Sequence, residues 1–284
     1  MDVGPLRDAL TVVIGLATGV LSGLFGVGGG VISQPAMRLL GLEPLFVIGT
    51  ALPVIIPGAA AGARRYAQEG LVRWAAVAAT VPAGVVAALA GSFLAEHVPG
   101  EGHLLQLITA GLLGLSSYRM GRPAPPALVT GDPEPLAETD APEAPAGAGP
   151  ARSSNRRGDR AQLVRFAAIG ATAGLLSGLL GIGGGVLMVP AFIALGHMDL
   201  KPAIATSLVC VGAFAVPGTV AHAFEGHVDW RVAAALVVGV VPGARVGSAL
   251  TIRAADRRLR VTVASFLGLT AIVYALGELR SLLA

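Results

Sequence analysis

The sequence predicts an all-α polytopic membrane protein made of two inverted homologous repeats. The chain has 284 residues, of which 54% are hydrophobic and only 13% are charged, and its mean hydropathy is +0.74. A soluble domain carries about 25% charged residues. Several apolar runs of about 20 residues, the length that crosses a bilayer as a helix, follow one another along the chain.

The repeat is visible in a glycine motif that occurs twice. Residues 21–30 read LSGLFGVGGG and residues 176–185 read LSGLLGIGGG, so eight of ten positions are identical. The spacing from Gly23 to Gly178 is 155 residues, and from Trp74 to Trp230 it is 156. A near-constant offset across a whole half indicates duplication, which is typical of membrane transporters.

The first repeat covers residues 1–121. Its first apolar run, about 6–25, ends at the glycines of 26–30, because glycine is about 1 kcal/mol less favourable than alanine in a helix. The next piece, about 31–40, is too short to cross a hydrocarbon core of about 30 Å. We therefore expect a glycine-broken helical hairpin followed by three transmembrane helices, at about 45–63, 73–95 and 103–120.

A linker at 122–160 separates the repeats. It is rich in proline, alanine and acidic residues, which is typical of a disordered segment, and we expect it to be cytoplasmic and replaceable by a short Gly/Ser sequence. The second repeat, 161–284, follows the plan of the first. Its expected elements are 162–180, the break Gly181–Gly185, the short piece 186–196, and spans at 202–222, 230–250 and 260–277.

The distribution of arginine predicts how the repeats are oriented. Loop 64–73 and loop 253–260 are rich in arginine, whereas 96–103 and 223–229 contain no lysine or arginine. Because basic loops stay in the cytoplasm, the two halves are predicted to be inverted. Each hairpin must then enter and leave on one side, so that the two glycine breaks meet near the middle of the membrane. If the first run simply spans, the halves are parallel and the four arginines of 253–260 lie outside.

A helix start follows each glycine break, and this pattern predicts an anion site. A helix N-terminus offers unpaired N–H groups and about half a positive charge, and glycine lets an anion approach the backbone. Alternatively, the glycines only permit close packing. Valine at Gly29 or Gly184 is expected to weaken binding while the protein still folds. The candidate substrate-binding glycines are Gly26, Gly28, Gly29, Gly30, Gly181, Gly183, Gly184 and Gly185.

Polar side chains near the breaks are further candidates. Thr50 lies in GTAL and Thr206 and Ser207 in ATSL, at the starts of the matching runs, and Gln34 lies one turn past the first break. Their side chains either donate to a bound oxyanion or, in the case of the hydroxyls, bond back to their own helix. The counterpart of Gln34 is Val189, so any role of Gln34 is one-sided.

Two titratable residues have two interpretations each: Arg245, well inside an apolar run, and His222, at the end of one. Arg245 either faces the bundle interior and marks a pathway or a partner, or extends toward the cytoplasmic end. His222 is either a proton-linked switch or an interfacial residue.

Other function classes fit poorly. No Gly-Lys-Ser/Thr follows the glycines, so they do not form a P-loop. The apolar runs hold too few His, Asp or Glu for an intramembrane enzyme, and an assembly protein would not need a duplicated break. The single Cys210 excludes a disulfide framework, and a net charge of +3 does not indicate a nucleic-acid partner.

We therefore expect a secondary transporter without cofactors, multi-pass in the cytoplasmic (inner) membrane. Its partners are the lipid bilayer and a small anionic substrate, with a coupling ion or proton and the oligomeric state left open.

The doubled glycine motif, with a proline after it in each half and ATSL downstream, resembles the TauE/SafE family of sulfite and organosulfonate exporters. The likeness covers both halves outside the linker. It implies an integral membrane anion transporter, whose relatives are associated with export of sulfite or sulfoacetate. GTAL in half one departs from ATSL in half two, so the hydroxyls are not symmetric.

Overall fold

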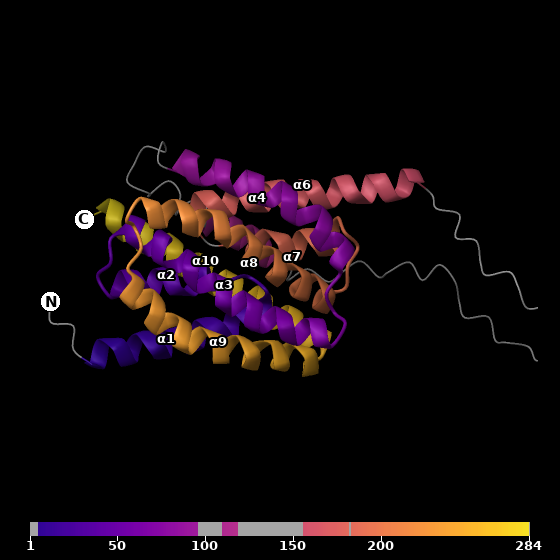
Figure 1. Cartoon of the computed structure of the whole chain (residues 1–284). Helices are drawn as coiled ribbons and strands as arrows, with labels where there is room; N and C mark the ends of the chain where they lie inside the picture. The colour runs from indigo at the N-terminus through magenta and orange to yellow at the C-terminus, as the bar shows by residue number, and fades with distance from the viewer. Residues whose placement is uncertain (1–4, 96–109, 119–155, 182, 284) are drawn as a thin grey trace, which may run out of the picture.

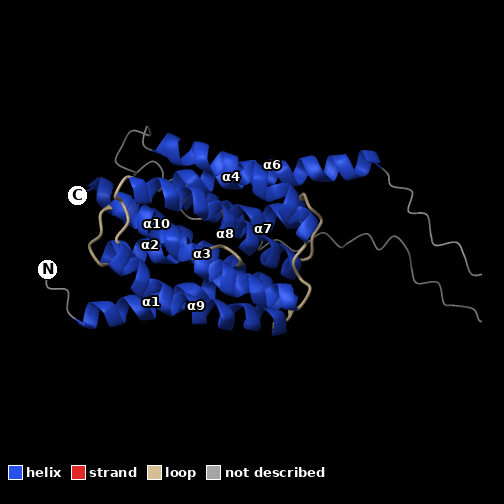
Figure 2. Cartoon of the chain, viewed as in Figure 1, coloured by secondary structure: helices blue, strands red, loops and turns tan. Residues whose placement is uncertain are grey.

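The computed structural model describes residues 5–95, 110–118, 156–181 and 183–283. Within these ranges every regular element is a helix, which confirms the predicted class (Figures 1 and 2). In the part of the chain that the structure describes, seven helices are long and apolar enough to cross a membrane. The helices are α1 Pro5–Phe25, α2 Gly30–Leu39, α3 Pro44–Gln68, α4 Trp74–Ala95, α6 Arg156–Leu180, α7 Gly185–Ala194, α8 Leu200–Phe224, α9 Trp230–Arg253 and α10 Asp256–Leu283, with a further helical segment at 110–118.

The described helices begin and end close to the expected residues, with one difference at the linker. Of the expected span 103–120 only the helical residues 110–118 are described, so its ends lie outside the described residues. Residues 156–160, assigned to the linker from composition, form the first turns of α6, which projects beyond its neighbours (Figure 1). Adding polar residues to an existing helix costs little, because only nucleation is unfavourable. Most of the predicted linker, 119–155, lies outside the described residues, so its disorder and location stay predictions.

Small residues let α1 lie directly against α9. A Cβ added to Gly15, Gly19 or Gly23 would overlap the backbone carbonyl oxygens of Leu236, Val240 and Ala244, respectively. The residue numbers rise together, so the two helices run parallel. Without a hydrophobic driving force in lipid, such backbone contact is how membrane helices gain packing energy.

Helices α4 and α6 form a second pair of the same kind. Gly170, Gly174 and Gly178 of α6 lie against the backbone carbonyls of Thr80, Gly84 and Ala88, and these helices also run parallel. Each pair therefore joins the hairpin of one half to a span of the other half.

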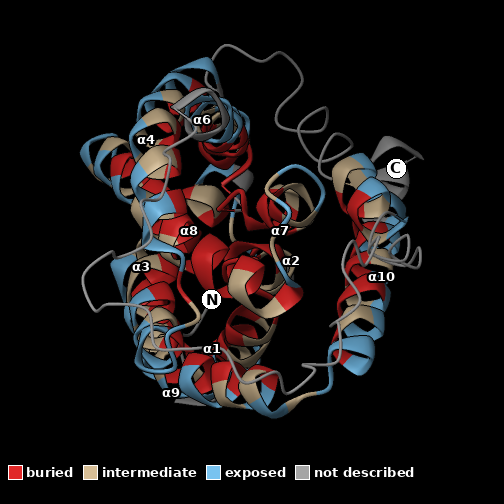
Figure 3. Ribbon diagram, turned by 90° about the vertical axis from the view of Figure 1, so that its right-hand side faces the viewer, coloured by how far each residue is buried: buried red, intermediate tan, exposed pale blue. Residues whose placement is uncertain are grey.

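The central helices α3 and α8 run antiparallel. Gly62 lies against Leu208, Gly212 against Ala59, and Gly218 against Leu52. Because α3 and α8 occupy equivalent places in the two halves, their opposite direction is the arrangement that inverted halves require. Figure 3 shows that the most deeply buried residues gather on α2, α7 and α8, around which the other helices stand.

Each short helix returns toward the start of its long partner. Arg7 Nη2, in the first turn of α1, donates to the carbonyl of Leu40 just after α2 over 3.4 Å. In the second half, Phe192 of α7 packs edge-to-face on Phe166 of α6, with ring centroids 5.9 Å apart. Both hairpins thus end near the place where they begin.

The two ends of the bundle differ in charge. The arginine-rich end, defined by loops 69–73 and 254–255 and the starts of α6 and α8, is tied together by a hydrogen bond from Lys201 Nζ to the Ile252 carbonyl (3.1 Å). The opposite end, called the histidine end, holds loops 40–43 and 225–229. Basic residues favour the cytoplasmic side, so we expect the arginine-rich end to face inward.

Candidate functional site at the two glycine breaks

The backbone at both breaks adopts conformations that favour glycine. Gly26 and Gly28 have φ of +66° and +81°, and Gly181, Gly183 and Gly184 have φ of +65°, +91° and +67°. Other residues are strained in this left-handed region. The sequence motif is therefore needed to end each long helix and turn the chain into the short one.

The two breaks meet inside the bundle. A Cβ on Gly185, the first residue of α7, would lie 2.5 Å from the carbonyl oxygen of Gly26 and 2.7 Å from Cα of Val27. Residues 26–31 and 183–186 are buried. The start of α7 therefore lies against the break that follows α1 in the other half.

At each break, one side chain from the other half forms a hydrogen bond to a backbone carbonyl. Ser207 Oγ, on α8, donates to the carbonyl of Gly26 over 2.9 Å. Gln34 Nε2, on α2, donates to the carbonyl of Leu180 over 3.1 Å, and Tyr274 of α10 donates to Gln34 Oε1 over 3.3 Å. The structure thus brings Gln34 and Ser207 to the breaks, where each bonds a carbonyl at the end of a long helix.

Thr50 and Thr206 are used differently. The hydroxyl oxygen of Thr50 accepts a hydrogen bond from the backbone N–H of Asp229 (3.0 Å), at the start of α9. The hydroxyl oxygen of Thr206 accepts one from the N–H of Arg73 (3.1 Å), just before α4. Both hydroxyls therefore brace equivalent loops at opposite ends of the bundle.

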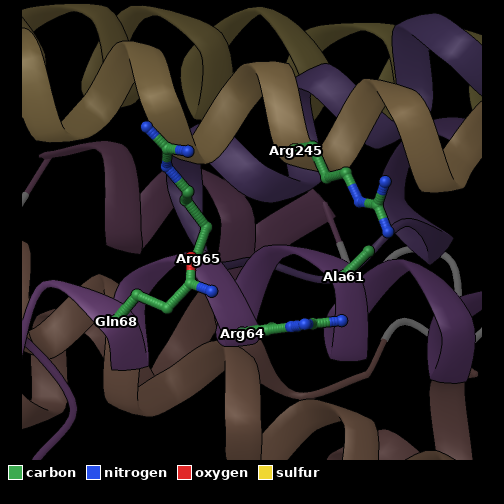
Figure 4. Close-up of a pocket in the computed structure, with 5 residues that line it drawn as sticks. All are labelled: Ala61, Arg64, Arg65, Gln68 and Arg245. Carbon is green, nitrogen blue, oxygen red and sulfur yellow. The ribbon is translucent and has the colours of Figure 1, made fainter.

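Arg245 is exposed on α9 rather than buried among the helices, and its role in a transport pathway stays a prediction. It lines a pocket of about 310 Å³ with Ala61, Arg64, Arg65 and Gln68. Figure 4 shows the Arg245 guanidinium next to Ala61, with Arg64 extending beneath it.

The comparison with known families decides the identity. The sequence profile described as "Sulfite exporter TauE/SafE" matches residues 11–274. The chain belongs to this family. Its glycine breaks, buried at the contact between two hairpins, are thus features of a TauE/SafE membrane transporter. No solved structure matches the chain.

Several TauE/SafE relatives are similar over most of their length. A probable membrane transporter protein of Xylella fastidiosa (strain 9a5c) is 27% identical over 247 residues, covering 86% of this chain and 85% of the relative. The probable membrane transporter protein YunE of Bacillus subtilis is 27% identical over 255 residues, covering 85% and 87%. A probable membrane transporter protein of Methanocaldococcus jannaschii is 22% identical over 277 residues, covering 91% and 92%.

The structure also shows two buried hydroxyls that were missed in the sequence. Thr18 Oγ1 and Ser177 Oγ have no hydrogen-bond partner among the described residues. The Cγ2 atom of Thr18 lies 2.9 Å from where a Cβ on Gly29 would be, so this side chain borders the first break. Thr18 and Ser22 share one face of α1, and hydroxyls spaced by four within an apolar run are a signal that could have indicated them.

Arg245→Leu tests whether the arginine pocket takes part in transport by this TauE/SafE protein. Since Arg245 is exposed and does not touch the breaks, we expect the variant to transport within about twofold of the wild-type rate, as surface changes usually cost less than 0.5 kcal/mol. Flux in proteoliposomes at equal protein content measures this. A loss of flux with normal folded yield would instead make Arg245 a substrate ligand.

Proposed function

We propose that this TauE/SafE transporter is a secondary transporter that moves a small oxyanion of the sulfite or organosulfonate class, held between the N-termini of α2 and α7. The observation that carries the proposal is the contact of Gly185 with Gly26 and Val27 inside the bundle. The start of α7 therefore lies in a buried place against the break that leads into α2.

The electrostatics of this place favour an anion. The N–H groups of the first turn, at Gly30 and Val31 and at Gly185 and Val186, have no acceptor within their own helices. From the contact, α2 runs back toward Arg7 and α7 runs back toward Phe166, at opposite ends of the bundle. Both positive helix ends therefore point at the same spot, and the low dielectric of the interior strengthens their effect.

Polar side chains supply further donors. The methyl group of Thr18 borders Gly29, and the hydroxyl of the same side chain has no hydrogen-bond partner among the described residues. Gln34 and Ser207 donate hydrogen bonds to carbonyls at the break of the opposite half. A bound anion would accept hydrogen bonds from these two side chains in place of the carbonyls. Partial charges also hold an oxyanion more weakly than an arginine would, which keeps release fast.

Export fits the expected orientation, because the arginine-rich end would draw anions from the cytoplasm. The sequence has no ATP-binding motif, so transport depends on an ion or proton gradient or follows the anion's own gradient.

Thr18→Val tests the site, since it removes only a hydroxyl that lacks a partner in the described structure. We expect normal folding and about tenfold to hundredfold weaker anion affinity, as a hydrogen bond to a charged group contributes about 1.5–3 kcal/mol. Anion-induced thermal stabilisation of purified protein, titrated with sulfite, sulfoacetate, sulfate and thiosulfate, is the measurement.

The matched control is Thr11→Val, two turns earlier on α1, where the hydroxyl donates to the Arg7 carbonyl over 2.8 Å. Its affinity should equal that of the wild type. Equal affinities in all three proteins would move the anion away from the first break. Absence of flux of any of the four anions in wild-type proteoliposomes would reject the substrate class.

A further inference from the structure

The histidine end contains a cluster that the transport mechanism does not use. His222 lies in the last turn of α8, Glu225 follows the end of that helix, and His227 lies in the loop before α9. Glu225 Oε2 is 3.1 Å from Nδ1 of His222 and 3.1 Å from Nδ1 of His227. The three ligand atoms all lie within 4.8 Å of one another.

The described residues use the hydrogen-bonding capacity of His222 only in part. The residue is only 4% exposed; its Nδ1 lies at ion-pair distance from Glu225 Oε2 without the geometry of a hydrogen bond, and its Nε2 has no partner among the described residues. A buried polar group without a partner costs about 1–3 kcal/mol. A ligand at the position between His222 and Glu225 would remove this cost.

We propose that His222, Glu225 and His227 bind a divalent transition metal ion, with Zn²⁺ as the ion that this ligand set suits best. Two imidazoles and one carboxylate are a common zinc ligand set, with metal–ligand bonds of about 2.0–2.2 Å. In a tetrahedron of such bonds, ligand atoms stand about 3.4 Å apart. The two 3.1 Å separations in the cluster are close to that value.

The surroundings of the cluster give it both support and access. The backbone carbonyl of His227 and Cβ of His222 lie against Gly49 of α3, and the ring of His227 packs edge-to-face on Phe46 with centroids 5.9 Å apart. The side chains of Glu225 and His227 are 29% and 30% exposed. An ion can therefore reach the cluster from solvent, and a water molecule can complete the coordination.

Nearby charged groups do not compete for the ion. Asp229 uses Oδ1 to accept hydrogen bonds from the N–H groups of Arg231 and Val232 at the start of α9, both at 3.1 Å. Arg231 is paired with Asp8 over 2.9 Å. A bound ion would join the end of α8 to the loop that leads into α9, next to the start of α3.

The test uses purified full-length protein, freed of any affinity tag and stripped with a chelator. Zn²⁺ alone is titrated by calorimetry, and Co²⁺ is used as a spectroscopic substitute. We expect saturable binding, a higher melting temperature, and visible Co²⁺ absorption of the intensity typical of four-coordinate sites. His227→Gln and Glu225→Gln should each weaken Zn²⁺ binding about a hundredfold or more, since even loss of an outer-shell partner costs 10–100-fold.

His197→Gln is the matched control, because His197 is an exposed histidine in the loop before α8, at the arginine-rich end. It should bind Zn²⁺ as the wild type does. His222→Gln extends the series if it folds, and His227→Gln decides the question if it does not. Failure of the wild type to bind Zn²⁺, or equal losses in the His197 and His227 variants, would overturn the proposal. Both readouts are independent of anion transport.

Discussion

Gly243→Leu is expected to abolish the folded protein. Gly243 lies in the α1–α9 contact, where an added Cβ would overlap the Leu16 carbonyl oxygen and come within 2.9 Å of the backbone nitrogen of Val20 and 3.1 Å of Cα of Gly19. These are backbone atoms, so no side-chain rotation can make room. The two helices would have to separate along their length, at a cost above the usual 1–3 kcal/mol for overpacking.

The folded fraction after detergent extraction, measured by size exclusion together with a melting curve, tests this expectation. Gly111→Leu is the control, because no atom lies within 4 Å of a Cβ added there and the residue is exposed. It should fold like the wild type. Similar melting temperatures for the Gly243 and Gly111 variants would show that α1 and α9 are not packed through their backbones.

Valine is expected to have different effects at the two breaks: at Gly184 it prevents folding, and at Gly29 it weakens anion binding. Gly184 has φ of +67°, and its Cβ would overlap the Ala173 carbonyl oxygen, so Gly184→Val should not fold. A β-branched residue is a genuine outlier in the left-handed region. Gly29 instead has φ of −69°, and its Cβ would meet only Cγ2 of Thr18, at 2.9 Å. Gly29→Val should therefore fold and lose anion-induced stabilisation.

This difference corrects the expectation that both valine variants would fold and bind less. The yield of monodisperse protein separates the two variants, and thermal stabilisation by the anion series then reports binding for the Gly29 variant. Gly29→Ala, which adds only the Cβ, provides an intermediate case. A stable Gly184→Val protein, or wild-type anion stabilisation in Gly29→Val, would contradict the assigned geometry.

The positions of the helices and the breaks could be predicted because they depend on local quantities. The length of each apolar run sets a span, and consecutive glycines end a helix whatever surrounds it. The expected break at 26–30 corresponds to the non-helical residues between α1 and α2, and the second break corresponds likewise. The contact between the two hairpins was expected because the arginine-rich loops indicate which loops stay in the cytoplasm. That distribution records how the chain inserts into the membrane, and it does not depend on how the helices pack.

The roles of individual side chains could not be predicted in the same way. Spans such as α4 and α8 are apolar around most of their circumference, so the pattern does not show which face packs. Whether Thr206 meets a loop and Ser207 meets a break depends on partners more than 100 residues away, at Arg73 and Gly26. Thr18 could not be identified from the sequence because its place at the site depends on its contact with Gly29, which follows it across the turn of the hairpin.

The pairing of α1 with α9 and of α4 with α6 means that neither repeat is a folding unit. Each hairpin rests on a helix from the other half, in the manner of subunits that exchange an element. A single repeat on its own would lack the helix on which its hairpin rests. The chain thus contains two helix pairs in backbone contact, and each pair takes one helix from each half. A displacement of α1 or α6 therefore acts directly on a helix of the other half.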